Sequence, residues 1–233
     1  MTLAIMQPYF LPYIGYLQLM NTVDTFVFYD DVAFINRGWI NRNRILVNGK
    51  DFLFTIPLKD ASQNRRICEI ELSSDAKWRS KLLKTMEQSY RKAPYYAAVF
   101  PVLEKIVNQE APNIAAYIQE GFVTLNQFLG INTKIIPTST VYGNDHLKAQ
   151  ERILDICKQE KANRYINPIG GMELYDKSLF ADSGIDLFFL QSKRVTYQQA
   201  GASEFIPWLS IIDILMHNDV PAIRKMLDEF ELV

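Results

Sequence analysis

Arginine, tryptophan and asparagine side chains alternate in the segment NRGWINRNRI, residues 36–45. In an extended chain successive side chains point to opposite faces, so Arg37, Trp39 and Asn41 share one face. A guanidinium binds phosphate or carboxylate through two parallel hydrogen bonds, and a tryptophan offers a flat surface to a base or a sugar. The pattern therefore predicts recognition of an anionic, ring-bearing small molecule. The structural alternative is an edge strand guarded by its arginines.

Two adjacent carboxylates, Asp30 and Asp31, directly follow the apolar run TFVFY of residues 25–29. Carboxylates at the end of a strand can bind a cation, orient a sugar hydroxyl or take a proton, although one of them can also cap the following turn. Because successive strand residues point to opposite faces, at most one of the pair is expected to enter a site, and the sequence leaves open which. We predict a catalytic role for this pair together with Gln7.

The loop QPYFLPY, residues 7–13, is stiff and rich in aromatic rings. Pro8 and Pro12 donate no backbone hydrogen bond, and each disfavours helix in the residue before it, so the first part of the loop is expected to be extended. Its rings can line a pocket or fill a core. Gln7 favours the pocket, since a core plug has no use for an amide. We expect this side chain to point into a cavity shared with Arg37 or with the aspartate pair.

Hydrophobic periodicity and turn signals divide the chain into alternating strands and helices, with a hairpin signalled by Asn48-Gly49. The expected strands cover residues 2–6, 25–29, 65–72, 133–137, 164–167 and 185–190. The expected helices cover residues 13–22, 77–91, 95–109, 113–129, 146–160, 172–182, 208–217 and 219–230.

This alternation predicts an α/β fold with a mostly parallel, Rossmann-like sheet, in which the strands at 2–6 and 25–29 are parallel neighbours. A nucleotidylyl-transferase-like arrangement is one form that such a sheet can take. We expect a single α/β domain over residues 1–233, with an inserted subdomain of a β-hairpin and helices at about residues 32–130.

Three loops are expected beyond the carboxyl ends of the parallel strands, where open sheets of this kind bind ligands. They are residues 7–13, 30–39 and 168–171, and Gly170-Gly171 in the last of them resembles half of a phosphate cradle before a helix. The structural alternative is that the aromatic rings pack against the end of the sheet and that the glycines only form a turn. The predicted substrate-binding residues are Tyr9, Tyr13, Tyr16, Asn36, Arg37, Trp39, Asn41, Arg42, Gly170, Gly171 and Tyr175.

Composition and charge favour a protein that acts on a small-molecule substrate. The 25 basic and 26 acidic residues leave a net charge of −1, so no overall field favours nucleic acid or an anionic membrane. No apolar stretch is long enough for a membrane span. The distant Cys68 and Cys157 predict a reduced, cytoplasmic setting, and with two histidines in the chain we expect no metal cage built from protein ligands alone. A cofactor and an oligomeric state are left unknown.

Several motifs together resemble the WbqC-like protein family, and the resemblance covers nearly the whole chain. The motifs are IMQPYFLPYIGYLQLM with DTFVFYDDVAFINRGWINRNRI, the pair Trp78 and Tyr90, RYINPIGG with SGIDLFF within residues 164–189, and LSIIDIL at 209–215. The family is associated with gene clusters for O-antigen and other surface polysaccharides, which implies an enzyme that works on nucleotide-activated sugars. A histidine found in many members is replaced here by Leu82, so the resemblance implies no histidine mechanism.

The residues and the resemblance together predict a bacterial enzyme of surface-polysaccharide biosynthesis. It is expected to transfer an acyl or aminoacyl group to the amine of a nucleotide-linked sugar, with a nucleotide sugar or an acyl donor as its small-molecule partner. One alternative is ATP-dependent nucleotidylyl transfer or carboxylate adenylation, because PYIGYLQLM has the spacing of the H-x-G-H-x-x-L signature, with Tyr13 and Tyr16 at the histidine positions. The other is a binding or scaffold protein of the same pathway without chemistry.

Overall fold

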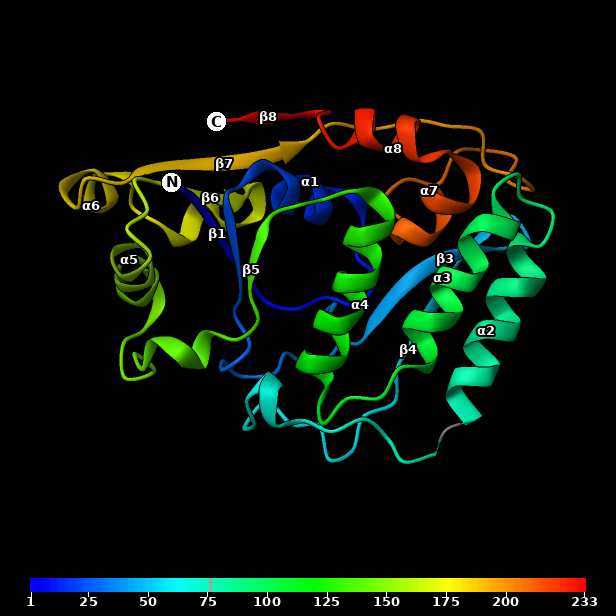
Figure 1. Cartoon of the computed structure of the whole chain (residues 1–233), viewed down its shortest axis with the longest axis horizontal. Helices are drawn as coiled ribbons and strands as arrows, with labels where there is room; N and C mark the ends of the chain where they lie inside the picture. The colour runs from blue at the N-terminus through cyan, green and yellow to red at the C-terminus, as the bar shows by residue number, and fades with distance from the viewer. Residues whose placement is uncertain (76) are drawn as a thin grey trace.

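The computed structural model describes residues 1–75 and 77–233, and over these residues a six-stranded sheet organises the chain (Figure 1). The strand order is β5-β2-β1-β6-β7-β8, and only the pairing of β7 with β8 is antiparallel. The mostly parallel, Rossmann-like α/β fold expected from the sequence is confirmed. The strands are β1 (Thr2–Met6), β2 (Thr25–Phe28), β5 (Lys134–Ile136), β6 (Arg164–Pro168), β7 (Asp186–Ser192) and β8 (Phe230–Leu232).

The order in which the chain adds strands to the sheet changes direction beside β1. From β1 the chain moves outward to β2, which is its parallel neighbour as predicted, and then to β5. It returns to place β6 on the other side of β1 and continues outward to β7 and β8. The carboxyl ends of β1 and β6 therefore flank the topological switch point, which is where open α/β sheets bind ligands.

Alternating side chains of the strands enter two hydrophobic cores, one on each face of the sheet. Ala4, Phe26 and Phe28 share a core with helices α1 (Ile14–Thr22), α4 (Ile114–Leu129), α7 (Ile211–His217) and α8 (Val220–Met226). Leu3 and Val27 enter the second core with α5 (Ala149–Gln159) and α6 (Lys177–Asp182). Figure 1 shows α4 and α5 on opposite sides of the strands.

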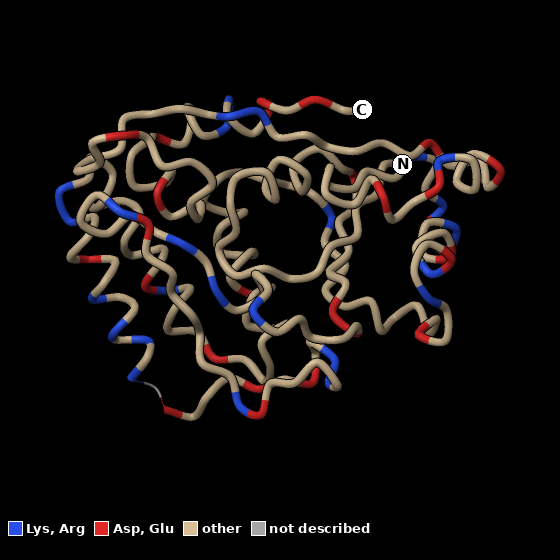
Figure 2. Tube along the Cα trace, turned by 180° about the vertical axis from the view of Figure 1, so that it is seen from behind, with Lys and Arg blue, Asp and Glu red and all other residues tan. Residues whose placement is uncertain are grey.

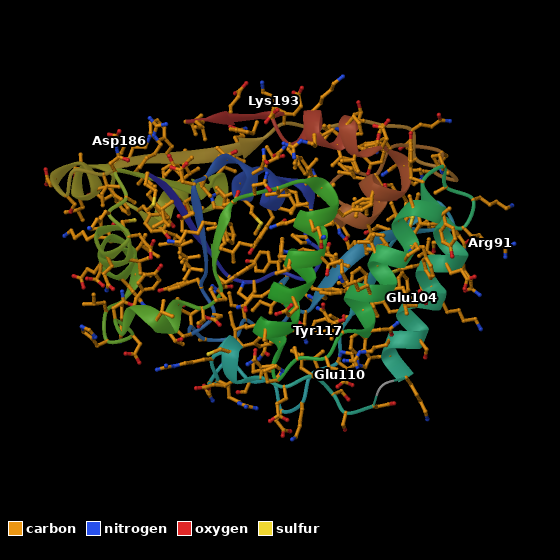
Figure 3. The ribbon with its side chains drawn as sticks, viewed as in Figure 1. Arg91, Glu104, Glu110, Tyr117, Asp186 and Lys193 are labelled. Carbon is orange, nitrogen blue, oxygen red and sulfur yellow. The ribbon has the colours of Figure 1, made fainter. Side chains whose placement is uncertain are left out.

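The chain between β2 and β5 contains the predicted hairpin and helices, namely β3 (Arg42–Val47), β4 (Lys50–Thr55), α2 (Lys77–Tyr90), α3 (Tyr96–Asn108) and α4. Asn48 and Gly49 have φ of +50° and +76°, which confirms the tight turn. Tyr117 of α4, labelled in Figure 3, is fully buried and stacks on Phe10 with ring centroids 5.5 Å apart. The hairpin and helices are thus packed against the loop that follows β1. The boundaries 32–130 of an inserted subdomain remain a prediction.

Two sequence predictions of local structure are wrong. Residues 65–72 form no strand but a 3₁₀ turn, Ile67–Glu69, because the amides of Ile67 and Cys68 donate to the carbonyls of Val32 and Asp30 in the loop after β2. The predicted helix 219–230 instead ends at Met226 and is followed by β8. A further difference is that the predicted helix 172–182 consists of a 3₁₀ segment, Ile169–Leu174, and the short α6, which Asp176 caps.

Charged residues of both signs are distributed along the whole trace (Figure 2). Helix α2 has a basic cluster of Lys77, Arg79, Lys81 and Lys84, whereas Glu87 is its only acidic residue. Over residues 1–75 and 77–233, no helix is both long and apolar enough to cross a membrane.

Candidate functional site

A cavity of about 430 Å³ lies at the carboxyl edge of the sheet, beside the switch point. Its volume falls in the range of small-molecule sites, and aromatic rings form much of its wall. Five separate parts of the chain contribute: the loop after β1, the loop after β6, the end of β7, the hairpin with the loop before it, and the segment before α7. The lining residues are Tyr9, Pro12, Tyr13, Trp39, Asn43, Arg44, Ile169, Gln191, Ser192 and Trp208.

Two tryptophans at this cavity remain largely open to solvent. Trp39 is 44% exposed and Trp208 is 46% exposed, which is unusual for the largest apolar side chain. Trp208 also has φ of +60°, a conformation that costs a non-glycine residue of the order of 1 kcal/mol or more. Its ring meets Tyr13 edge-on, with centroids 6.0 Å apart. Exposed rings held in a strained position are typical of a surface that stacks against a ligand.

Arg44 supplies the positive charge at the cavity. Its guanidinium pairs with Asp51 at 3.1 Å and lies 5.9 Å from the centre of the Trp39 ring. Its Nε atom is buried and has no hydrogen-bond acceptor among the described residues. A buried donor without an acceptor costs free energy, so the guanidinium is held at the cavity with one of its donors unpaired.

The segment 193–210, here called the strap, carries Trp208 over the cavity and is tied to its other walls. The Ser210 hydroxyl donates to the carbonyl of Leu11 at 2.6 Å, and the Ser210 amide donates to the carbonyl of Arg44 at 2.8 Å. The amide of Ile211 donates to the carbonyl of Pro12 at 2.8 Å. The loop after β1, the hairpin and the strap therefore form one hydrogen-bonded unit.

A buried carboxylate, Asp213 of α7, fixes the strap through hydrogen bonds. It is 0% exposed and accepts hydrogen bonds from the hydroxyls of Tyr90 and Tyr197 at 2.9 and 2.6 Å, and from Gln199 Nε2 at 2.8 Å. Burial, and then the nearby Asp213 charge, raise the pKa of both tyrosines, so they stay protonated donors. The amide of Ala200 in the strap donates to His217 Nε2 at 3.0 Å.

Asp30 and Asp31 are both buried and belong to a separate polar network. Asp31 pairs with Arg152 of α5 at 2.5 Å, in an ion pair that is almost completely shielded from water. Asp30 accepts from the Thr138 hydroxyl at 2.8 Å and from the Ser139 amide at 3.0 Å. Burial raises the pKa of Asp30, while these two hydrogen bonds oppose the increase. The described lining of the cavity does not include either carboxylate.

Four predicted binding residues line a second, more open cleft of about 280 Å³. Trp39 lines the cavity instead, so the alternating segment is divided between the two hollows. The guanidinium of Arg42 lies 5.8 Å from the centre of the Trp39 ring, which therefore stands between them. The four residues in the cleft are Asn36, Arg37, Asn41 and Arg42.

Several other predicted residues lie outside both hollows as described. Gln7 Oε1 is buried and has no donor among the described residues. Tyr16 is 2% exposed, stacks on Phe122 and donates its hydroxyl to the Gln7 carbonyl at 2.9 Å. Gly170 and Gly171 lie in the 3₁₀ segment after β6, and Tyr175 packs edge-on against Tyr165. Of the predicted binding residues, Tyr9, Tyr13 and Trp39 are the ones that line the cavity.

Sequence reasoning missed part of the cavity wall. The sequence pattern offers only the guarding of an edge strand as a role for Arg44, and it contains no signal that brings the end of β7 or the strap to a site. The available signal for Trp208 was a tryptophan in FIPWL, directly after a proline and at the first position of the predicted helix 208–217. The missed lining residues are Pro12, Asn43, Arg44, Ile169, Gln191, Ser192 and Trp208.

Comparisons with known proteins find similarity along nearly the whole chain. The model of the WbqC-like protein family matches residues 7–225. The chain is similar to the uncharacterized protein Rv1507c of Mycobacterium tuberculosis, with 26% identity over 216 residues that cover 92% of each chain. No solved structure matches the chain. In the part of the chain that the structure describes, no group of three or more His, Cys, Asp or Glu side chains is placed to hold a metal ion.

Proposed function

Because the chain belongs to the WbqC-like protein family, whose model matches residues 7–225, we propose that its cavity binds a nucleotide-linked amino sugar for acyl or aminoacyl transfer. The observation that carries the proposal is the combination of exposed tryptophans with an unsatisfied arginine donor in one cavity. Trp39 and Trp208 offer flat surfaces to a base or a sugar, and Arg44 Nε offers a hydrogen bond to a phosphate oxygen.

In the proposed reaction the sugar amine attacks the carbonyl carbon of an activated acyl donor. A C–N bond forms, the bond between the acyl carbon and its leaving group breaks, and the amine loses a proton to a base. Asp30 is the better candidate base of the pair, since Asp31 is paired with Arg152 whereas Asp30 accepts from uncharged donors. Because neither carboxylate lines the cavity, the proton has to reach Asp30 through an intervening group. Gln7 Oε1 is a buried acceptor without a described donor, but Gln7 lines neither hollow, so the proposal gives this side chain no contact with the substrate.

Intrinsic fluorescence offers a direct test of binding, because two of the three tryptophans line the cavity. Titration with UDP-glucosamine, dTDP-glucose and ATP is expected to change the emission in a saturable way for at least one nucleotide sugar. Trp39→Ala or Trp208→Ala should weaken that binding about tenfold or more, since stacking on one ring contributes about 1–3 kcal/mol. Both variants should keep the native melting temperature within a few degrees, because the replaced rings are half exposed.

Arg44→Met keeps the length of the side chain and removes the guanidinium. It should weaken nucleotide sugars about tenfold and leave the affinity for a nucleoside without phosphate unchanged. Asp51→Asn is the matched control, because it breaks the exposed ion pair of Arg44 without touching Nε. A saturable response to ATP alone would favour the adenylation alternative. If no nucleotide or nucleotide sugar changes the emission, the proposed function is wrong.

A further inference from the structure

We propose that the cleft lined by Arg37 and Arg42 is a second binding site, which takes the oxyanion group, phosphate or carboxylate, of a second small substrate. Its role as the site of the co-substrate rests on the proposed function, whereas its capacity to bind an oxyanion does not. The cleft has a volume of about 280 Å³ and places two guanidinium groups beside the amides of Asn36 and Asn41. Apolar residues such as Phe34 and Pro57 form the rest of the lining, and the amide nitrogen of Asn41 already donates to the carbonyl of Ile56 at 2.8 Å. The two guanidinium groups are therefore the donors that would recognise an oxyanion.

Arg37 occupies a backbone position at which arginine is costly. The amide of Gly38 donates to the carbonyl of Ile35 at 3.0 Å and closes a turn, in which Arg37 is the third residue. Its φ of +60° is the conformation that glycine or asparagine adopts most easily at this position. The side chain is exposed, so packing does not explain the choice of arginine. A strained, exposed arginine at the rim of a cleft is typical of a residue retained for binding.

Arg42 is held in place and still has donors to offer. Its Nε donates to the carbonyl of Gly38 at 2.7 Å, and the guanidinium packs over the Trp39 ring. Among the described residues, no carboxylate lies within 4.0 Å of the guanidinium of Arg37 or Arg42. Arg44 and Arg66 differ in this respect, since Arg44 pairs with Asp51 and Arg66 pairs with Asp145. Arg65 has no carboxylate partner among the described residues either, but its guanidinium donates to the backbone carbonyls of Asp60 and Glu69.

Trp39 joins the cleft to the cavity. It lines the cavity directly, and the guanidinium of Arg42 on the cleft side lies 5.8 Å from the centre of its ring. A group-transfer enzyme must hold two substrates next to each other, so a cleft whose arginine lies close to a ring of the cavity suits such an enzyme. The geometry therefore assigns the ring of one substrate to the cavity and the oxyanion of the other to the cleft.

Side-chain NMR can test the cleft separately from the cavity. In the full-length protein the Nε–H signals of Arg37 and Arg42 are expected to shift in a saturable way with inorganic phosphate, acetate or both. Arg37→Gly should weaken the remaining response of Arg42 at least tenfold. This variant relieves the positive φ, so it is expected to fold, and nucleotide sugars should still change its tryptophan emission as in the native protein. Arg42→Lys keeps the charge, removes the planar fork and should weaken the response of Arg37.

Arg91 provides a matched control, since it is exposed near the end of α2 (Figure 3). Arg91→Ala should leave the signals of Arg37 and Arg42 and their midpoints unchanged. A response to phosphate alone or to acetate alone supports the proposal and names the group that is bound. The proposal is overturned if neither ion gives a saturable shift, or if Arg91 responds as strongly as the two arginines of the cleft. Intact anion binding without any response to nucleotide sugars would instead overturn the proposed function only.

Discussion

Adjacent residues of the same type have different surroundings in this protein. Asp30 and Asp31 follow one strand, yet Asp31 contacts the charged Arg152 whereas Asp30 accepts hydrogen bonds from the uncharged Thr138 and Ser139. A buried carboxylate beside a guanidinium is stable as an ion, but one with uncharged donors still has a desolvation cost. Replacement by asparagine is therefore expected to lower the stability of the protein at Asp31 and to be tolerated at Asp30.

Asp31→Asn should destabilise the protein by roughly 3–5 kcal/mol, because it leaves the guanidinium of Arg152 buried without its partner. Asp30→Asn should be tolerated, since the amide oxygen can accept the same two hydrogen bonds. The pKa of Asp30 is raised above its ordinary value of 3.8 by burial. The free-energy contribution of Asp30 to folding is therefore most favourable below pH 3.8, where its carboxyl group is protonated. This contribution is lost as the pH rises through the pKa of Asp30 in the folded state.

Asp30→Asn should accordingly gain stability relative to the native protein as the pH rises from 3.8 to 7. Urea denaturation at a series of pH values measures both variants. Equal losses for the two substitutions at pH 7 would contradict the assignment. If Asp30→Asn folds normally and loses acyl transfer, the proposed role of Asp30 as base is supported.

At the scale of single elements, the β3–β4 hairpin depends on its turn and also on a contact with the strap. Gly49 has φ of +76°, and a Cβ atom at this position would lie 2.6 Å from the carbonyl oxygen of Gly201. Turn chemistry predicts the first constraint from Asn48-Gly49, but the second arises only because residue 201 folds back onto the hairpin.

Gly49→Val should lower the free energy of unfolding by 1 kcal/mol or more, through backbone strain and through displacement of the strap. Asn48→Gly is the control, since glycine adopts the same positive φ without strain, and it should change stability by less than about 0.5 kcal/mol. Thermal and urea unfolding provide the comparison. A Gly49→Val protein as stable as the native one would show that the turn can rearrange freely.

At the scale of the whole molecule, Asp213 connects parts of the chain that are far apart in sequence. Tyr90 donates to Asp213 and accepts from the amide of Leu46, so α2, α7 and β3 meet at one hydroxyl. Tyr197 and Gln199 add the strap to the same carboxylate. The cavity wall that carries Trp208 is thus stabilised by a network lying behind it.

Asp213→Asn replaces one acceptor oxygen by an amide donor and leaves buried donors unpaired. It should cost about 1–3 kcal/mol of stability and weaken nucleotide-sugar binding measured by tryptophan emission, because the strap is held less firmly. Tyr197→Phe removes one of the same hydrogen bonds and should give a smaller effect of the same sign. Lost stability with unchanged ligand binding would mean that the network supports the fold but does not position the strap.

Much of the architecture could be predicted from the sequence, because it depends on neighbouring residues. Near-continuous apolar runs and short strand-helix-strand spacing predicted the parallel pair β1–β2, and Asn48-Gly49 predicted the hairpin turn. The failures at residues 65–72 and 219–230 have a common cause. Their backbone groups hydrogen-bond to segments that are distant in sequence, as when Gln18 donates to the carbonyls of Met226 and Glu229. Local propensity depends on neighbouring residues alone, so it cannot predict such partners.

The candidate site, too, has features that the sequence predicts and features that depend on the tertiary structure. Residue types alone indicated aromatic and arginine side chains for an anionic, ring-bearing ligand, and the residue order placed the loop after β1 at the carboxyl edge of a sheet. Only the tertiary structure decided that the strap reaches this loop through Ser210 and Leu11, 199 residues apart, and that Arg44 faces the cavity. It also divided Arg37 from Trp39, because the Ile35–Gly38 turn interrupts the extended chain on which their common face depended. Side-chain alternation acts over a few residues, whereas the convergence of loops is set by the packing of whole helices and strands.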